Sequence, residues 1–437
     1  MKTDKLFNVT YSLIIGLGLL FLGIIILVGR KWLYINVVNL FIIALFILSI
    51  RDILNYFKST KRNKSIDFIR SITSMMFCLI FTFFKNIPLS ILPIVFGFYL
   101  VLNASIKIIN LVLLIENRAP GKLTESFLIL LYLGVGISCI FAPLRNLEGI
   151  LVIIGIYLIL LGLNFIRDFL PVRFKDKVKR RIRVSMPTIL EAIIPFTVLN
   201  EINYLLDKKS MDEEFVYEEK NGDVEPDIEV LVHISNRGWN RLGHCDIVYN
   251  GKVLSYGSYD KSTLKFFNTI ADGVVFTADV KKYIPFCIKY SKKTLFSFGL
   301  KLSDKQKENV LKEIDTLFKN LTPWESAYQV ALKESNEVNK EDYGDYASCL
   351  YMATNADMYK FTKGRYKKYF TLGNNCVKLA DEIIGKSGID AFKMYGIITP
   401  GAYYEYLNRE FKKKNSMVIS RKIYNDRSIK KRKRSKK

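Results

Sequence analysis

The chain has 437 residues, half of them hydrophobic, and yet it carries a formal net charge of +24. Ordinary soluble domains seldom combine these properties, and the length allows two or three domains. Long apolar runs dominate up to about Ile166, and charged residues become dense after Arg167. The composition therefore argues against a purely soluble protein and predicts a membrane region followed by a polar domain.

Six apolar runs approach the length of about 20 residues that a helix needs to cross a bilayer. They are Val9–Gly29, Leu33–Ile50, Phe68–Phe84, Ile91–Ile106, Phe127–Ala142 and Leu151–Ile166. The first is too long for a signal peptide and has no small-residue cleavage site, so we interpret it as an anchor. Residues 1–170 are therefore predicted to form an α-helical polytopic membrane domain of six spans in a bacterial-type cell membrane.

The positions of Lys and Arg in the short loops predict the orientation of the spans. Basic residues gather in Arg51–Arg70 and again in Arg173–Arg183, which places both segments in the cytoplasm. Arg30 and Lys31, in the first outer turn, argue the other way. Six spans with the N-terminus inside would leave everything after Arg167 in the cytoplasm.

The membrane region contains three related segments: Ser49–Leu54, Ser105–Asn110 and Phe165–Leu170. Their starts lie roughly 56 to 60 residues apart, the length of two spans with their loops, which predicts three helical hairpin repeats. With its Gly-rich spans, this pattern resembles the HdeD-like six-helix membrane family, and the resemblance implies little about chemistry. Lys107 is the one charge that could fall inside a span, where it can extend to the interface. A transporter is therefore only the third-ranked function.

Residues 171–227 are expected to join the membrane region to a soluble domain. The basic cluster Lys177–Arg183 would contact anionic lipid headgroups. Met186–Leu206 is apolar but interrupted by polar residues, which favours an amphipathic helix in the interface. Two alternatives remain for this segment. It could be a core helix of the next domain, or it could be a seventh span, which would place that domain outside. Lys208–Asp227 has the composition of a linker.

Residues 228–411 have the pattern of an α+β domain. Strands are predicted in Ile228–Ser235, Gly273–Val280 and Thr294–Leu302, and a hairpin is predicted around Asn250–Gly251. Helices are expected after Ser303, after Cys376 and in Gly401–Phe411. Residues 412–437 form a basic tail that we expect to be disordered and to contact anionic lipid rather than a specific nucleic acid.

Two histidines and six scattered cysteines limit the possible chemistry. Cys376 precedes a predicted helix, whose N-terminus lowers the pKa of a thiol. His244 enters a strand, and a His beside a thiolate is an arrangement used in nucleophilic catalysis. His233 is interpreted as structural and Cys245 as core, on the opposite strand face from His244. The spacing of these residues is poor for a metal site, and we expect no metal or cofactor.

The order of His first and Cys later resembles that of circularly permuted papain-like (NlpC-type) folds. Val230–Asp260, with its Gly243–His244 step, and the later Asn375–Cys376 step resemble the Lnb N-terminal domain family. This resemblance implies Cys376 as nucleophile and His244 as base. It also implies a third polar group from the next strand, which points to Tyr256, then to Ser258 or Asp260. Asn375 and the N–H of Cys376 are candidate oxyanion contacts.

The predicted function is that of a membrane-anchored thiol hydrolase or acyltransferase acting on an amide, ester or thioester. The membrane placement favours a lipid-linked or acylated substrate. A non-catalytic membrane scaffold or sensor with a binding-only soluble domain is the alternative.

Overall fold

The computed structural model describes residues 2–58, 64–169, 215–219, 225–234, 243–290, 294–334, 338–386, 400–413 and 416–424. The chain divides into two compact units, which are described separately. One contains residues 15–109 and 123–163, and the other contains residues 1–14, 110–122 and 164–437. The predictions for Lys177–Arg183, Met186–Leu206 and the last residues of the basic tail fall outside the described residues.

The N-terminal region is helical and apolar, as the sequence predicts. Its helices are α1 (Lys2–Lys58), α2 (Lys64–Phe83), α3 (Asn86–Glu116), α4 (Lys122–Phe141) and α5 (Pro143–Phe169). Four segments among the described residues are long and apolar enough to cross a membrane: Leu13–Leu54, Asn86–Glu116, Lys122–Phe141 and Pro143–Ile166. These helices confirm a multi-pass type of membrane region.

The helix α1 contains a break that corresponds to the predicted turn between the first two apolar runs. Arg30 has φ 38° and ψ −130°, which are not helical angles. Phe68–Phe83 is an additional apolar helix, shorter than the four candidate spans. Six crossings and three repeats therefore stay predictions.

Glycines allow close approach between helices within the membrane unit. A Cβ atom added to Gly97 would lie 2.7 Å from the carbonyl oxygen of Gly136, so α3 and α4 touch through their backbones. Gly23 and Gly155 make the same kind of contact between α1 and α5. Small residues favour such packing in membranes, where helices gain little from the hydrophobic effect.

Lys107, which the sequence analysis singled out, forms an ion pair in this unit. Its Nζ lies 2.8 Å from Oε2 of Glu125 on α4, and both side chains are largely buried. The pair offsets the cost of placing either charge alone in an apolar region. Lys107 is thus explained by its partner rather than by an ion pathway.

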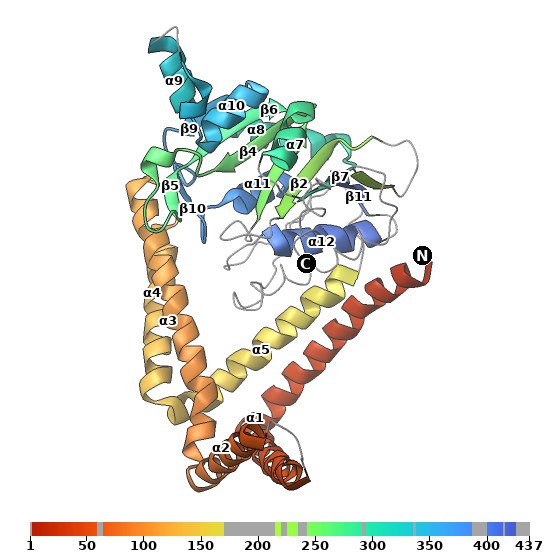
Figure 1. The fold of residues 1–437 in the computed structure, drawn as a ribbon, viewed down its shortest axis with the longest axis vertical. Helices are drawn as coiled ribbons and strands as arrows, with labels where there is room; N and C mark the ends of the chain where they lie inside the picture. Colours follow the sequence, from red (N-terminus) through yellow and green to blue (C-terminus); the bar gives the residue numbers. More distant parts are fainter. Residues whose placement is uncertain are drawn as a thin grey trace. The chain divides into compact units, whose positions relative to one another are not determined.

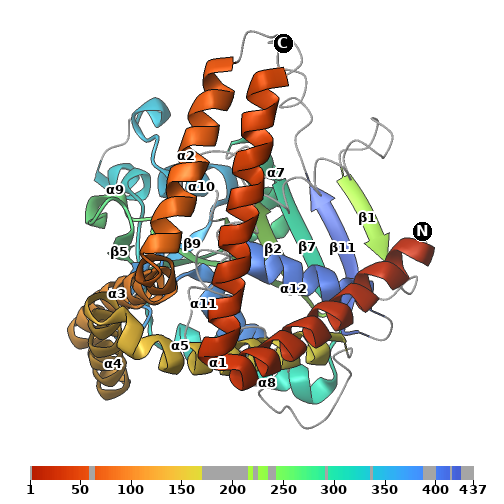
Figure 2. The same ribbon diagram turned by 90° about the horizontal axis from the view of Figure 1, so that it is seen from below.

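The second unit is built on a large antiparallel sheet, confirming the α+β class (Figures 1 and 2). The strand order among the described residues is β1-β11-β7-β2-β3-β4-β6-β9-β8. The strands are β1 (Phe215–Glu219), β2 (Ile228–Ile234), β3 (His244–Tyr249), β4 (Lys252–Gly257), β6 (Val274–Asp279), β7 (Thr294–Leu300), β8 (Leu321–Pro323), β9 (Asp357–Phe361) and β11 (Val418–Tyr424). A separate ribbon pairs β5 (Ile270–Asp272) with β10 (Lys368–Phe370).

Side-chain alternation gives the sheet two buried faces. The helices are α7 (Val280–Lys289), α8 (Asp304–Phe318), α9 (Ala327–Glu334), α10 (Tyr346–Thr354), α11 (Cys376–Gly385) and α12 (Pro400–Lys412). Val230 and Ile247 pack in one core with residues of α11 and α12. Leu231 and Val248 pack in the other core with residues of α7 and α10. The sheet is therefore the middle layer between two sets of helices.

The predicted hairpin forms as expected. Asn250 and Gly251 connect β3 to β4 with φ values of 49° and 72°. Two consecutive positive φ values are those of a type I′ turn, which Asn-Gly favours. This turn fixes the register of β3 against β4 and so determines which residues of β3 share a face.

The domain extends beyond the predicted range of 228–411 at both ends. β11 lies in the segment that we expected to be a disordered tail, and for Val418–Tyr424 that prediction is wrong. β11 pairs with β7 on one side and with β1 on the other, and β1 lies in the predicted linker. Val418 and Ile423 are buried in the core shared with α11. The C-terminal strand is thus part of the fold.

We expect Ile423→Ala to lower the free energy of unfolding of this domain by about 2–5 kcal/mol, because it empties a buried site. Thermal unfolding of the full chain in detergent measures the change. Val330→Ala, at a position on α9 that is 41% exposed, is the control and should have little effect. Equal stability of both variants would show that β11 is dispensable.

Candidate active site

The start of α11 places the Cys376 thiol at a helix N-terminus. Asn375 is the N-cap, and its side-chain oxygen accepts the backbone N–H of Lys378 at 3.0 Å. Its Nδ2 donates to the carbonyl of Thr371, also at 3.0 Å. Both ends of the amide therefore hold the turn that presents Cys376. Helix N–H groups and the helix dipole favour an anion at this position.

His244 is the first residue of β3, against which α11 packs. Gly243 precedes it with φ 78°, a left-handed conformation that a side chain would strain. The His244 ring hydrogen-bonds to the Cys376 thiol. The structure thus brings together the two residues that the sequence analysis proposed as nucleophile and base.

Asp246 is the acidic partner of His244. Its Oδ1 lies 2.7 Å from His244 Nε2, and its side chain is fully buried. Residues two apart on a strand point to the same face, which brings the two groups together. Its Oδ2 lies 2.6 Å from His233 Nε2 and accepts the Tyr283 hydroxyl at 2.8 Å. His233, which we interpreted as structural, is therefore a neighbour of the site.

Two hydroxyl groups complete the surroundings of the His244 ring. The Ser255 and Tyr259 hydroxyls each lie 2.9 Å from His244 Nε2 and 2.8 Å from each other. With Asp246, they surround Nε2.

Charge within the site favours a thiolate and an imidazolium. Burial alone would raise the pKa of the Cys376 thiol, but the positive charge and hydrogen bond of His244 outweigh it and lower that pKa. Burial opposes the charged form of His244, but the carboxylate of Asp246 and the Cys376 thiolate raise its pKa to about 10. Despite burial, the two histidines hold the pKa of Asp246 well below its usual range. The ion pair resembles the activated form of catalytic cysteines.

Cys245 illustrates the contrast between the two faces of β3. It is buried in the α11 core, as the sequence predicts, and burial raises the pKa of its thiol well above the ordinary value. Its backbone N–H, however, hydrogen-bonds to Cys376 and helps to lower the pKa of that thiol. Of Cys245 and Cys376, only Cys376 has a lowered thiol pKa, which is the property that a nucleophile needs.

The residues proposed for the third polar group lie elsewhere. Tyr256 is buried in the α11 core and donates its hydroxyl to the Tyr366 carbonyl at 2.9 Å. Asp260 lies 2.6 Å from Lys360 Nζ, and Ser258 is half-buried in the turn after β4. The position beside His244 is occupied by Asp246. The signal that could have identified it is the His-x-Asp spacing at the start of β3.

Tyr369 is a further residue next to the thiol that the sequence analysis did not identify. Its hydroxyl lies 4.0 Å from Cys376 Sγ and accepts the Cys376 backbone N–H. Burial and the charge of Cys376 raise the pKa of this phenol well above 10, so the hydroxyl keeps its proton. A protonated hydroxyl at this position can donate to an oxyanion that forms on a carbonyl attacked by Sγ.

Comparison of the chain with family models, curated proteins and solved structures finds no match. The resemblances to the HdeD-like and Lnb N-terminal domain families therefore stay predictions. Among the described residues, no group of His, Cys, Asp and Glu could hold a metal ion. The geometry by itself defines a candidate Cys-His-Asp site.

We expect iodoacetamide to alkylate Cys376 at pH values well below the ordinary thiol pKa of about 8.5, because its lowered pKa keeps the thiolate populated as the pH falls. The rate should drop only as the pH passes through the lowered value. Peptide mass spectrometry of the full chain, labelled across the pH range, measures this profile. Alkylation that rises only near pH 8.5, unchanged by His244→Ala, would exclude the ion pair.

Asp246→Asn should shift the same profile upward, because removing the carboxylate lowers the pKa of His244 and weakens its support of the thiolate. This loss should outweigh the relief of the direct repulsion between Asp246 and the thiolate, which is the smaller effect on the pKa of Cys376. Each unit of increase in the pKa of Cys376 lowers the low-pH rate about tenfold. Tyr283→Phe, which removes one hydrogen bond to Asp246 but keeps the charge, is the matched control and should shift the profile less. A purely structural role for Asp246 would leave the midpoint in place.

Proposed function

We propose that the chain is a membrane-anchored thiol hydrolase or acyltransferase that acts on an amide, ester or thioester. The observation that carries this proposal is the Cys376 thiol hydrogen-bonded to His244, with His244 held 2.7 Å from the buried Asp246. A carboxylate beside an imidazole that is itself beside a thiol is the arrangement used in nucleophilic catalysis by cysteine.

The reaction begins with attack of the Cys376 thiolate on the substrate carbonyl carbon. The new C–S bond pushes an electron pair onto the carbonyl oxygen, and Tyr369 and the helix N-terminus donate hydrogen bonds to it. When this pair returns, the bond to the leaving group breaks, and the imidazolium of His244 gives its proton to the leaving amine, alcohol or thiol. The product of this half-reaction is an acyl-enzyme with neutral His244.

The second half-reaction releases the acyl group. His244 removes a proton from water, or from an amine or lipid hydroxyl, as that nucleophile attacks the thioester carbonyl. The C–S bond then breaks, and the Cys376 thiolate and the imidazolium form again. Water gives hydrolysis, and any other nucleophile gives acyl transfer.

The chain order supports a permuted papain-like fold. His244 and Asp246 lie on β3, which comes before α11 and its Cys376 in the sequence. The thiol helix packs against the strand that carries the base. This is the His-before-Cys order of the permuted folds, and it is the basis on which we extend the Lnb-type resemblance to this domain.

The membrane region suggests where the substrate comes from. We propose six crossings with the catalytic domain in the cytoplasm. The support is the basic composition of Arg51–Arg70 together with apolar helices at each of the six predicted runs. A domain tethered to a bilayer meets lipid-linked or acylated molecules at a high local concentration. Such molecules are therefore the substrate class that we favour.

The alternative function is a membrane scaffold or sensor whose soluble domain only binds. The small exposed fraction of Cys376, 3%, is the observation that favours it. The two functions differ in whether a covalent bond forms at Sγ.

We expect the full chain in detergent to acquire an acyl adduct on Cys376 when it is mixed with nitrophenyl esters of short and long fatty acids. Intact mass and peptide mapping measure the adduct. It should vanish in Cys376→Ala, form more slowly in His244→Ala and persist in Cys349→Ala, which removes a half-buried thiol outside the site. An adduct that survives in Cys376→Ala, or none in any variant, would favour the binding-only alternative.

A further inference from the structure

The hairpin before β5 displays two large aromatic side chains. Lys265 and Ile270 close it with a pair of backbone hydrogen bonds of 2.8 and 3.3 Å. At its tip, Phe266 is 60% exposed and Phe267 is 84% exposed. We refer to Phe266–Asn268 as the aromatic tip. Two adjacent phenylalanines on a short loop are an apolar surface that water does not favour.

The aromatic tip has a strained backbone. Phe266, Phe267 and Asn268 have φ values of 48°, 55° and 63°, in the left-handed region that bulky residues rarely adopt. The Thr269 N–H and hydroxyl both bond to the Phe266 carbonyl, at 3.1 and 2.7 Å. Strain held in place by surrounding hydrogen bonds is typical of functional segments. Here the strained segment carries the two exposed rings.

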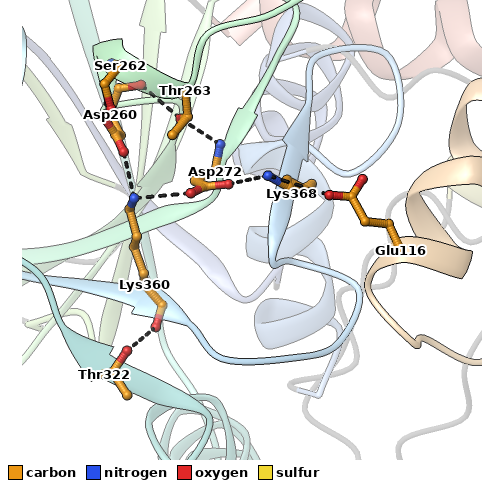
Figure 3. Close-up of polar contacts among 8 residues, drawn as sticks. All are labelled: Glu116, Asp260, Ser262, Thr263, Asp272, Thr322, Lys360 and Lys368. Carbon is orange, nitrogen blue, oxygen red and sulfur yellow. Dashed lines mark hydrogen bonds and ion pairs between the residues drawn. The ribbon is translucent and has the colours of Figure 1, made fainter.

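The acidic side chains at the base of the hairpin are paired with lysines (Figure 3). Asp260 and Asp272 lie 2.6 and 3.1 Å from Lys360 Nζ. Lys368 lies 2.5 Å from the other oxygen of Asp272. These lysines neutralise both carboxylates, while Lys261 and Lys265 are exposed to solvent. Exposed aromatic groups flanked by lysines suit the interface of a bilayer with anionic lipids.

A contact within the same compact unit brings this ribbon to the end of a candidate span. Lys368, on β10, lies 3.7 Å from Oε1 of Glu116, the last residue of α3 (Figure 3). Nearby, Gly364 donates its N–H to the carbonyl of Asn117 at 3.2 Å. A spanning helix ends at the headgroup region, so groups that contact Glu116 lie at that level.

The hairpin is also connected to the turn that presents the thiol. The Thr371 N–H and hydroxyl both donate to the Thr269 carbonyl, at 3.0 and 3.2 Å. The Thr371 carbonyl in turn accepts Nδ2 of Asn375, the N-cap beside Cys376. Two hydrogen-bonded steps therefore join the aromatic tip to the start of α11.

We propose that Phe266 and Phe267 insert into the headgroup region of an anionic bilayer and so hold the turn before Cys376 at the membrane surface. Lys261 and Lys265 bind the lipid phosphates beside the inserted rings. The membrane contact stands independently of catalysis, whereas its effect on the turn rests on the proposed function.

The test uses Phe267→Trp in the full chain, reconstituted in vesicles of phosphatidylcholine and phosphatidylglycerol. Bromine atoms on the upper acyl chains of the phosphatidylcholine quench a tryptophan that reaches them. After subtraction of the emission of the unsubstituted chain, we expect the new tryptophan to lose intensity in brominated vesicles and to emit at shorter wavelength. Leu332→Trp on α9, at a position 44% exposed, is the control and should do neither.

Each outcome bears on the proposal. Emission typical of water without quenching would overturn it, and so would short-wavelength emission without quenching, which places the ring against protein or a second copy. When Lys261→Glu and Lys265→Glu are added to the Phe267→Trp chain, weaker quenching supports the proposed role of the two lysines. Unchanged quenching would show that the lysines do not contribute to the membrane contact.

The effect on the site is measured separately, by acyl-adduct formation on Cys376. Phe266→Ser/Phe267→Ser should slow it in vesicles and leave it unchanged in detergent. An equal rate in vesicles would overturn the link to the turn. If no variant forms an adduct while Phe267→Trp is quenched, the proposed function fails and the membrane contact stands.

Discussion

The buried negative charge of Asp246 is the constraint on which the candidate site depends. A carboxylate removed from water is costly unless charged and hydrogen-bonding groups surround it. Here the His244 imidazolium supplies positive charge, His233 contacts the second carboxylate oxygen, and Tyr283 supplies a hydrogen bond. The β2–β3 register places the two histidines opposite each other, and α7 brings the tyrosine. The fold is therefore arranged to keep a cation beside Cys376.

His244 links the two faces of the sheet. Tyr283, which bonds to Asp246, belongs to the core beneath α7, whereas Cys376 belongs to the core beneath α11. His244 contacts groups from both because it stands at the first position of β3, directly after Gly243 with its positive φ. A histidine in the middle of the strand would be confined to one face. The positive φ of Gly243 thus has a chemical consequence as well as a conformational one.

Local signals in the sequence predicted local features well. The Asn250–Gly251 turn, the helix that begins at Cys376 and the pairing of Cys376 with His244 depend on short segments or on chain order. Asp246 was not identified, because one carboxylate inside an apolar strand gives no sign of the groups that will neutralise it. β11 was not identified either, because its pairing with β1 and β7 is long-range and its neighbours in sequence are basic. Such features depend on tertiary contacts that a single sequence does not display.

The structure separates the reactivity of the thiol from access to it. His244 lowers the pKa of Cys376, and the carboxylate of Asp246 keeps His244 charged. Both residues lie on β3. Access is a different matter, since only 3% of Cys376 is exposed. The turn that precedes it is held by Thr371 and Asn375, and Thr371 bonds to the hairpin that carries the aromatic tip. Hydrogen bonds therefore link the hairpin to the turn before Cys376, whereas the charged groups that activate the thiol lie on β3.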